Sequence, residues 1–165
     1  MSKDAVDLIA DAWARELPGV TGLELELSKR AARLSGLFTA RVNAELDRLG
    51  LTKAEYEVLA VLRSAGEPYR LRPSDLTQRL LLSSGGTSNV LRRLEAAGLI
   101  AREADASDAR STWVRLSAKG ITVAEDAVRA AARAQSALLR TMPPDVAAAV
   151  NDALRRALVA LGDVP

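Results

Sequence analysis

The sequence predicts a mainly α-helical protein with one small β hairpin. Hydrophobic residues make up 48% of the 165 residues but aromatic ones only 3%, and Ala and Leu dominate instead. Both residues lose little side-chain entropy in a helix. Apolar positions recur at helical spacing near both ends of the chain, whereas TWVRL at 112–116 alternates as a strand does.

Two helices are expected in the N-terminal part. Residues 4–16 form a short amphipathic pattern, which Pro18 and Gly19 end. A longer helix follows over about 22–48 until Gly50. Its apolar side consists of Leu23, Leu27, Leu34, Phe38, Val42 and Leu46.

The middle of the chain carries two helix-start signals. Thr52 and Glu55 form a capping box for a helix through Arg63. Ser74 is the expected N-cap of a short helix over 74–81.

A further helix begins within SSGGTSN (83–89) and ends at Ala97, with Gly98 in the C′ position. A hairpin follows, in which residues 99–104 pair with TWVRL across the polar turn ASDARS (106–111).

The C-terminal part predicts two more helices. Ser117 caps a long helix to about residue 140. Pro143 and Pro144 separate it from a last helix with an apolar stripe.

The order of the middle elements is that of a winged helix-turn-helix, in which a short helix turns into a second helix that enters the major groove of DNA. Small polar residues at the start of the second helix permit close approach to DNA, and free backbone N–H groups there suit phosphate oxygens. An ordinary tight turn is the alternative. The expected DNA-contacting residues in this helix are Ser84, Gly86, Thr87, Ser88, Asn89, Arg92 and Arg93.

The hairpin tip adds the candidates Asp108, Arg110 and Ser111. An arginine on a β wing can enter a minor groove, where the negative potential is focused. Asp108 would orient Arg110 or hold an arginine of the second helix, whereas the plain alternative is a solvated polar turn.

The charge distribution supports a polyanionic partner. Residues 63–93 hold six arginines against Glu67 and Asp75, whereas residues 1–27 hold two basic residues against six acidic ones. A basic central segment favours nucleic acid, although a solvated arginine face has the same composition. The net charge of +2 argues against an architectural protein without sequence preference.

Several classes of protein are disfavoured. The chain has no Cys and no His, so thiolate metal sites, thiol switches and the usual general base are excluded. No recognisable catalytic set remains, and we expect neither an enzyme nor a cofactor or metal. The N-terminus lacks the apolar core of a signal peptide and no apolar run is long enough for a membrane span, so a cytoplasmic protein is expected.

The segments RLEAAGLI, DAR and VRLSAKG (93–100, 108–110 and 114–120) give the chain a close resemblance to the MarR family of bacterial transcriptional regulators. The helix order extends the resemblance over roughly residues 22–162. It implies a homodimer on a pseudo-palindromic operator, read in the major groove by the helix near 85–97 and in the minor groove by the wing. It also implies release from DNA by a small ligand, often an anionic aromatic compound.

The N-terminal helix with DAWARE resembles the urate-responsive branch of that family. This resemblance implies a ligand site that includes Trp13, Glu57 and Arg102. Glu57 stands where the branch has Asp, and Val90 stands where it has Arg. Trp13 could equally be a core or interface anchor, and Arg102 a phosphate contact.

These inferences divide the chain into three parts. Residues 1–50 are expected to serve dimerisation and form a pocket wall, 51–116 to bind DNA, and 117–165 to dimerise. The function expected is a sequence-specific repressor released by an aromatic or anionic ligand. A dimeric ligand-binding or scaffold protein of the same fold, without specific DNA binding, is the alternative.

Overall fold

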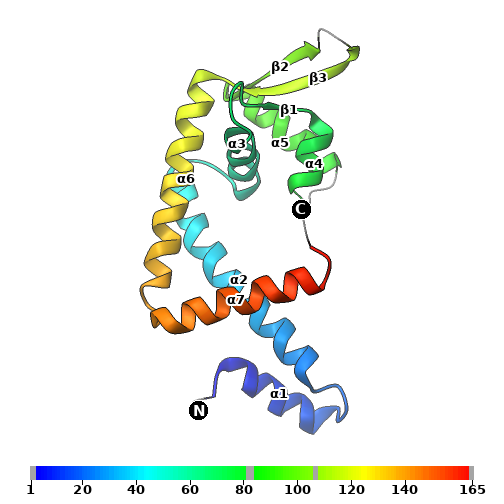
Figure 1. The fold of residues 1–165 in the computed structure, drawn as a ribbon, viewed down its shortest axis with the longest axis vertical. Helices are drawn as coiled ribbons and strands as arrows, with labels where there is room; N and C mark the ends of the chain where they lie inside the picture. Colours follow the sequence, from blue (N-terminus) through cyan, green and yellow to red (C-terminus); the bar gives the residue numbers. More distant parts are fainter. Residues whose placement is uncertain (1–2, 81–83, 106–107, 164–165) are drawn as a thin grey trace. The chain divides into compact units, whose positions relative to one another are not determined.

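The computed structural model describes residues 3–80, 84–105 and 108–163, and all of their side chains except those of residues 84, 105 and 108–111. The fold class expected from the sequence is confirmed, since the described residues form mainly helices and one small antiparallel sheet (Figure 1). The chain divides into two compact units, residues 1–41 and 42–165. The elements in chain order are α1 (Ala5–Glu16), α2 (Leu23–Arg48), α3 (Lys53–Ser64), β1 (Arg70–Leu71), α4 (Pro73–Leu80), α5 (Ser84–Ala96), β2 (Ile100–Asp105), β3 (Asp108–Leu116), α6 (Ala118–Leu139) and α7 (Pro144–Ala160).

In the first unit, ionic contacts fix the start of α1 to α2. Asp4 caps α1 by accepting hydrogen bonds from the amides of Val6 and Asp7, and the Asp7 carboxylate accepts one from the Asp4 amide. Arg30 of α2 donates to Asp4 at 2.9 Å, to Asp7 at 2.7 Å and to Glu26 at 2.6 Å. The Arg30 guanidinium, together with the Asp7 amide, lowers the pKa of the Asp4 carboxyl to about 2.

In the second unit, one apolar core joins α3, α4, α5, the sheet and α6. The capping box of Thr52 and Glu55 starts α3 as expected. Helix α6 contributes alanines rather than large side chains, so its backbone packs close to α3. The core residues with the least exposure are Leu46, Val58, Leu59, Leu62, Leu76, Leu94, Val114, Leu116, Ala124, Ala127 and Ala131.

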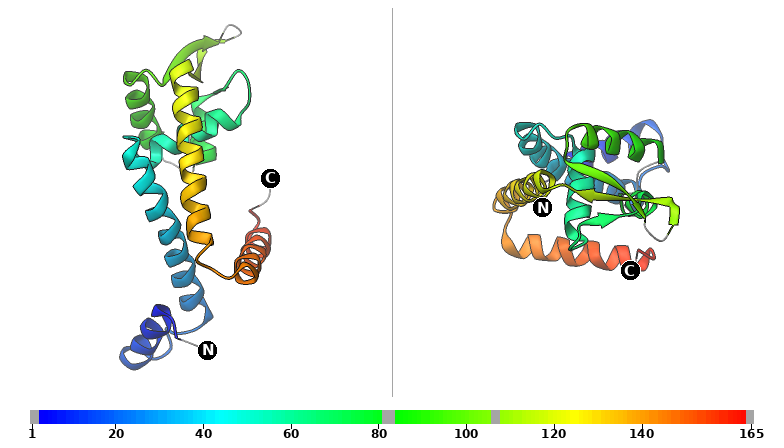
Figure 2. Two further views of the ribbon diagram at one scale, coloured as in Figure 1. Left: turned by 90° about the vertical axis from the view of Figure 1, so that its left-hand side faces the viewer. Right: turned by 90° about the horizontal axis from the view of Figure 1, so that it is seen from above.

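The sheet has one strand more than the sequence analysis expected. Its order is β1-β3-β2, with both pairs antiparallel. Strand β1 has only two residues, which are too few to show the alternation of apolar and polar residues that predicts a strand. Within β3, Val114 and Leu116 face the core as predicted, and the β2–β3 hairpin projects beyond the helices (Figure 2).

Two local expectations were wrong. Helix α4 begins at Pro73, so Ser74 lies inside its first turn instead of capping it. Proline suits that position because its missing N–H would have no partner there and its φ is already helical. Strand β3 begins at Asp108, so the residues 108–111 belong to the strand and not to a turn. Backbone pairing with β2 extends β3 beyond the alternating segment TWVRL at 112–116 as far as Asp108.

The root of α6 is tied to the turn between α5 and β2. The Ser117 hydroxyl donates to the Gly98 carbonyl at 2.7 Å and accepts from the Gly120 amide at 2.9 Å. The Ser117 amide donates to the Leu99 carbonyl at 3.0 Å, and Lys119 Nζ to the Ala97 carbonyl at 3.1 Å. Three of these bonds connect the start of α6 to residues 97–99 between α5 and β2, and the fourth, from the Gly120 amide, caps α6 itself.

Helix α7 has no buried residue, although it carries an apolar stripe. It runs across the end of α6 instead of alongside it (Figures 1 and 2). Its exposed apolar side chains are Val146, Leu154, Leu158 and Val159, and Leu161, which caps its C-terminal end, is exposed as well. None of the described helices has the length and apolar character to cross a membrane.

Candidate nucleic-acid interface

Helix α5 has two different faces. Leu91 and Leu94 are buried in the core, 2% and 1% exposed, and fix the helix to the domain. The opposite side exposes Gly85, Ser88, Asn89 and Arg92, which recur at spacings of three or four residues. This periodicity places a stripe of small and polar groups on one accessible side of the helix.

Two of the expected contact residues at the start of α5 differ in exposure. Gly86 is exposed, whereas Thr87 is only 2% exposed and faces the interior. A contact of Thr87 with DNA would therefore come from its backbone. The side chain of Ser84 lies outside the part that the structure describes.

The two arginines of α5 are placed differently. Arg92 is exposed and donates to Asn89 Oδ1 at 2.8 Å, within the polar stripe. Arg93 instead lies 3.1 Å from Glu55, whose side chain is 8% exposed. The second carboxylate oxygen of Glu55 accepts from the amide and hydroxyl of Thr52. Arg93 thus supplies the counter-charge of a buried carboxylate.

The wing candidates lie on one strand. Asp108, Arg110 and Ser111 belong to β3, and their side chains are among those that the structure does not describe. A register irregularity falls in β2 between Ala104 and Asp105. The roles of these three residues at DNA stay predictions.

The outer face of the sheet holds a cluster that sequence reasoning missed. We call it the arginine–tryptophan face and define it as Arg70, Arg72, Glu103, Trp113 and Arg115. The guanidinium carbons of Arg70 and Arg72 lie 4.7 Å and 5.0 Å from the centroid of the Trp113 ring. Glu103 accepts from Arg115 at 2.6 Å and lies 3.9 Å from Arg70. The pairing of β1 with β3 brings this cluster together. In the sequence, only the two-residue spacing of Trp113 and Arg115 indicates that two of its members share a face.

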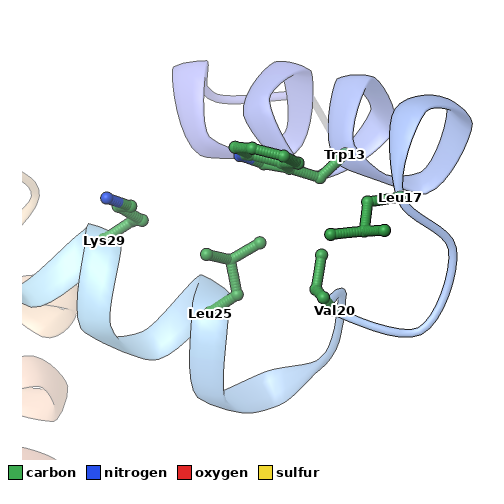
Figure 3. Close-up of a pocket in the computed structure, with 5 residues that line it drawn as sticks. All are labelled: Trp13, Leu17, Val20, Leu25 and Lys29. Carbon is green, nitrogen blue, oxygen red and sulfur yellow. The ribbon is translucent and has the colours of Figure 1, made fainter.

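The three expected ligand residues fall in different units. Trp13 of α1 belongs to the first unit, where it lines an apolar hollow of about 330 Å³ together with Leu17, Val20, Leu25 and Lys29 (Figure 3). The indole nitrogen lies at the Lys29 end of this hollow (Figure 3).

Glu57 and Arg102 belong to the second unit and have separate partners. Glu57 lies 3.6 Å from Lys53, and Arg102 lies 3.2 Å from Glu95 of α5. Val90 stands where the urate-responsive branch has an arginine, and its side chain packs against the core.

Comparison with known proteins identifies the fold and the family. The MarR-family profile matches residues 49–111. The Mycobacterium tuberculosis transcriptional repressor Rv2887 is 36% identical over 103 residues, which are 60% of this chain and 71% of that protein. The transcriptional regulator PecS of Dickeya dadantii is 27% identical over 115 residues, 70% of this chain and 69% of that protein.

Solved structures share the fold. Sco5413, a MarR-family regulator from Streptomyces coelicolor, superposes with a TM-score of 0.72 at 26% identity, covering 86% of this chain and 98% of that one. A mutant of Escherichia coli MarR complexed with operator DNA gives a TM-score of 0.71 at 21% identity, with 88% and 97% covered. The chain therefore belongs to the MarR family of transcriptional regulators and is a DNA-binding regulator, not an enzyme.

Proposed function

We propose that this protein is a cytoplasmic repressor that binds a pseudo-palindromic operator as a homodimer and is released by a small aromatic or anionic ligand. The observation that carries the DNA part is the contrast between the two faces of α5. Buried leucines anchor one face, and the other offers Ser88, Asn89 and Arg92 to a groove. Such a helix, held rigidly by a core, is the means by which helix-turn-helix proteins read base edges.

Pairing of two chains is supported by apolar surface that a single chain leaves uncovered. Helix α7 and the helices of the first unit expose large apolar side chains, Leu23 at 76% and Leu158 at 48% among them. A two-fold interface covers the same patch on both copies. It would also present two copies of α5 to two half-sites of DNA.

The wing is tested by Arg110→Ala. We expect this change to abolish specific operator binding and to leave the fold intact, because a minor-groove arginine contributes both charge and fit. Fluorescence anisotropy with the protein's own upstream DNA measures the affinity, and circular dichroism checks the fold. Unchanged affinity and unchanged salt dependence would remove the wing from the mechanism.

The ligand part of the proposal concerns a smaller molecule than urate. A buried anion requires paired cations or several hydrogen bonds. Arg102 already pairs with Glu95, and Val90 packs against the core, so the two-arginine arrangement of the urate-responsive branch is not matched residue for residue. Trp13 and Lys29 offer an apolar wall and one cation instead.

Ligand titration of a protein–operator complex tests this preference. We expect urate to release the DNA weakly and small aromatic carboxylates to release it better. A lost charge-assisted contact costs roughly 1.5–3 kcal/mol, or about ten- to a hundred-fold in affinity. Release of the wild-type protein by micromolar urate would contradict this assignment.

A further inference from the structure

The exposed stripe of α5 contains a hydrogen-bonded pair, Asn89 and Arg92, about one helical turn apart. Both side chains are exposed, and Nη2 of Arg92 donates to Oδ1 of Asn89 at 2.8 Å. A guanidinium has only N–H donors, so the Asn89 atom that faces it is the amide oxygen. Arg92 therefore determines which way the Asn89 amide points, whereas an amide without such a partner could turn over and exchange its donor for its acceptor.

The Asn89 amide keeps both an acceptor and a donor for a base. Its oxygen has two lone pairs, of which Arg92 uses one. Its Nδ2 group has no partner among the described residues. An acceptor beside a donor matches the major-groove edge of adenine, where the N6 amino group donates and N7 accepts. Guanine offers acceptors alone, cytosine a donor and thymine an acceptor, so adenine is the base that can bind both groups of a fixed amide.

The position of Asn89 on α5 suits contact with a base. Asn89 lies in the second turn of α5, and the second helix of a helix-turn-helix contacts base edges with residues near its start. Gly85 lies one turn before it on the same stripe, and a Cβ atom built on Gly85 would have no described atom within 4 Å. Side chains in a helix lean towards the preceding turn. The Asn89 amide therefore leans towards a stretch of the helix surface where no side chain keeps a base away.

Two ion pairs restrain the rotation of α5 about its own axis. Arg93 lies 3.1 Å from Glu55 of α3. Glu95 lies 3.2 Å from Arg102 of β2. Among the described residues Arg92 pairs with no carboxylate, so its charge and its remaining donors are available to a phosphate.

We propose that Asn89 reads one adenine in each half-site of the operator and that Arg92 is its positioning residue. Asn89 accepts a hydrogen bond from adenine N6 and donates one to N7, while Arg92 holds the amide and gives other N–H groups to a backbone phosphate. This inference rests on the proposed function and assigns a base to it. A two-bond contact of this kind discriminates against a wrong base by roughly five- to 150-fold.

Binding-site selection from a randomised duplex library tests the base preference. The wild-type protein should select adenine at one position of each half-site, and Asn89→Ala should lose the preference at that position with an unchanged salt slope. Asn89→Asp should select cytosine there, because a carboxylate still pairs with Arg92 but can only accept, and cytosine N4 donates. The matched control Gln135→Glu makes the same change from amide to carboxylate at an exposed position of α6. It should select the same sequence as the wild type.

Variants of Arg92 separate positioning from charge. Arg92→Ala should lower the slope of log K against log salt by about one, and it should also weaken the adenine preference because the amide can then turn over. Arg92→Lys keeps the charge and a donor, so it should restore the slope and part of the preference. An adenine preference that Arg92→Ala leaves unchanged would contradict the positioning role.

Modified bases test the two hydrogen bonds one at a time. In the selected operator, 7-deazaadenine removes N7 and purine removes the N6 amino group. Each replacement should lower the affinity of the wild-type protein several-fold and leave that of Asn89→Ala unchanged, as measured by anisotropy. Circular dichroism and sedimentation check that each variant keeps its fold and association state.

Three outcomes have distinct meanings. Identical base preferences of the wild type and Asn89→Ala, with wild-type binding intact, would overturn the proposal. A selected guanine that disappears in Arg92→Ala, without any adenine that depends on Asn89, would overturn it too and make Arg92 the residue that reads the base. Failure of the wild-type protein to select any sequence would instead overturn the proposed function itself.

Discussion

Gly120 sits where α6 touches the backbone of the turn before β2. A Cβ atom at this position would overlap the carbonyl oxygen of Leu99. Because that oxygen belongs to the backbone and accepts the Ser117 amide, it cannot swing aside as a side chain would. The absence of a side chain at residue 120 therefore permits the close contact.

We expect Gly120→Ala to lower the free energy of unfolding by about 1–3 kcal/mol, the usual cost of forcing extra volume into a packed site. Urea denaturation followed by circular dichroism measures the change. Gly36→Ala is the control, because Gly36 lies inside α2 with nothing near its missing Cβ. That variant should gain up to about 1 kcal/mol from helix propensity. If the two substitutions changed the free energy of unfolding equally, the close contact of Gly120 with the Leu99 carbonyl would be contradicted.

Asp4 makes the attachment of α1 sensitive to acid. Its pKa is lowered to about 2 from an ordinary 3.8, first by the hydrogen bond from Arg30 and then by the Asp7 amide. A lowered pKa means that the carboxylate stabilises the folded form above pH 3.8, and that this contribution is lost as the pH falls towards 2.

Trp13 on α1 reports this transition. In a Trp113→Phe background we expect its emission to shift to longer wavelength between pH 3.8 and about 2, and Arg30→Ala to shift it at neutral pH already. Asp11→Asn is the control, since Asp11 pairs only with Lys3 among the described contacts, within the N-terminal segment itself. If the emission of Arg30→Ala shifted over the same pH range as that of the parent protein, the ionic attachment of α1 to α2 would be refuted.

Sequence reasoning succeeded for residues whose partners are close in the chain. The Thr52–Glu55 capping box, the Ser117 cap and the positive φ of Gly98 all follow local rules. It missed the pair of Glu55 with Arg93, which are 38 positions apart and meet only after the core has formed. It missed the contact of Arg63 with Glu125 of α6 for the same reason.

At the scale of single elements, α5 separates two arginines that look alike in the sequence. Arg92 lies on the exposed stripe, whereas Arg93 neutralises Glu55. We expect Arg92→Ala to reduce the salt slope of DNA binding by about one and to leave stability unchanged. Arg93→Ala should lower stability by roughly 1–2 kcal/mol, because the buried carboxylate loses a partner.

Anisotropy and urea denaturation of the two variants separate these roles. Glu55→Gln combined with Arg93→Ala should recover part of the lost stability, since no buried charge then remains unpaired. If Arg93→Ala reduced the salt slope as much as Arg92→Ala and left stability unchanged, both arginines would be phosphate contacts.

The elements themselves were predictable where they are long and periodic. Six of the expected helices begin within one or two residues of their observed positions. Strand β1 was not predictable, because two residues become a strand only through pairing with β3. The arginine–tryptophan face depends on that pairing, so no local pattern could reveal it.

At the scale of the whole molecule, a single chain leaves the apolar stripe of α7 uncovered. We expect a dimer at micromolar concentration, because obligate dimers bury roughly 2,000 Å² or more. Leu158→Glu should yield monomers in sedimentation equilibrium, since it places a charge in the stripe. Arg156→Glu introduces the same side chain beside Asp152 on the other side of α7 and should remain dimeric.

The dependence of the melting temperature on protein concentration is a second test of the dimer. The melting temperature of the wild-type protein should rise with protein concentration, because association binds only the folded chain. Leu158→Glu should melt at a temperature that does not depend on concentration. If the wild-type chain sedimented as a monomer, the prediction that a second chain covers the apolar stripe of α7 would be contradicted.

Three hydrogen bonds join the start of α6 to the segment between α5 and β2, so any tilt of α6 about this point as a pivot would act on all three elements. Helix α6 has 22 residues and is therefore about 33 Å long. A tilt of about 5° at its far end displaces that end by about 3 Å over such a length. Since the end of α5 and the start of the wing share the pivot, the same small rotation turns the reading surface through the same angle. We expect a small tilt of α6 to change the spacing between the two half-sites that a dimer accepts, although α6 lies far from the bases that α5 would touch.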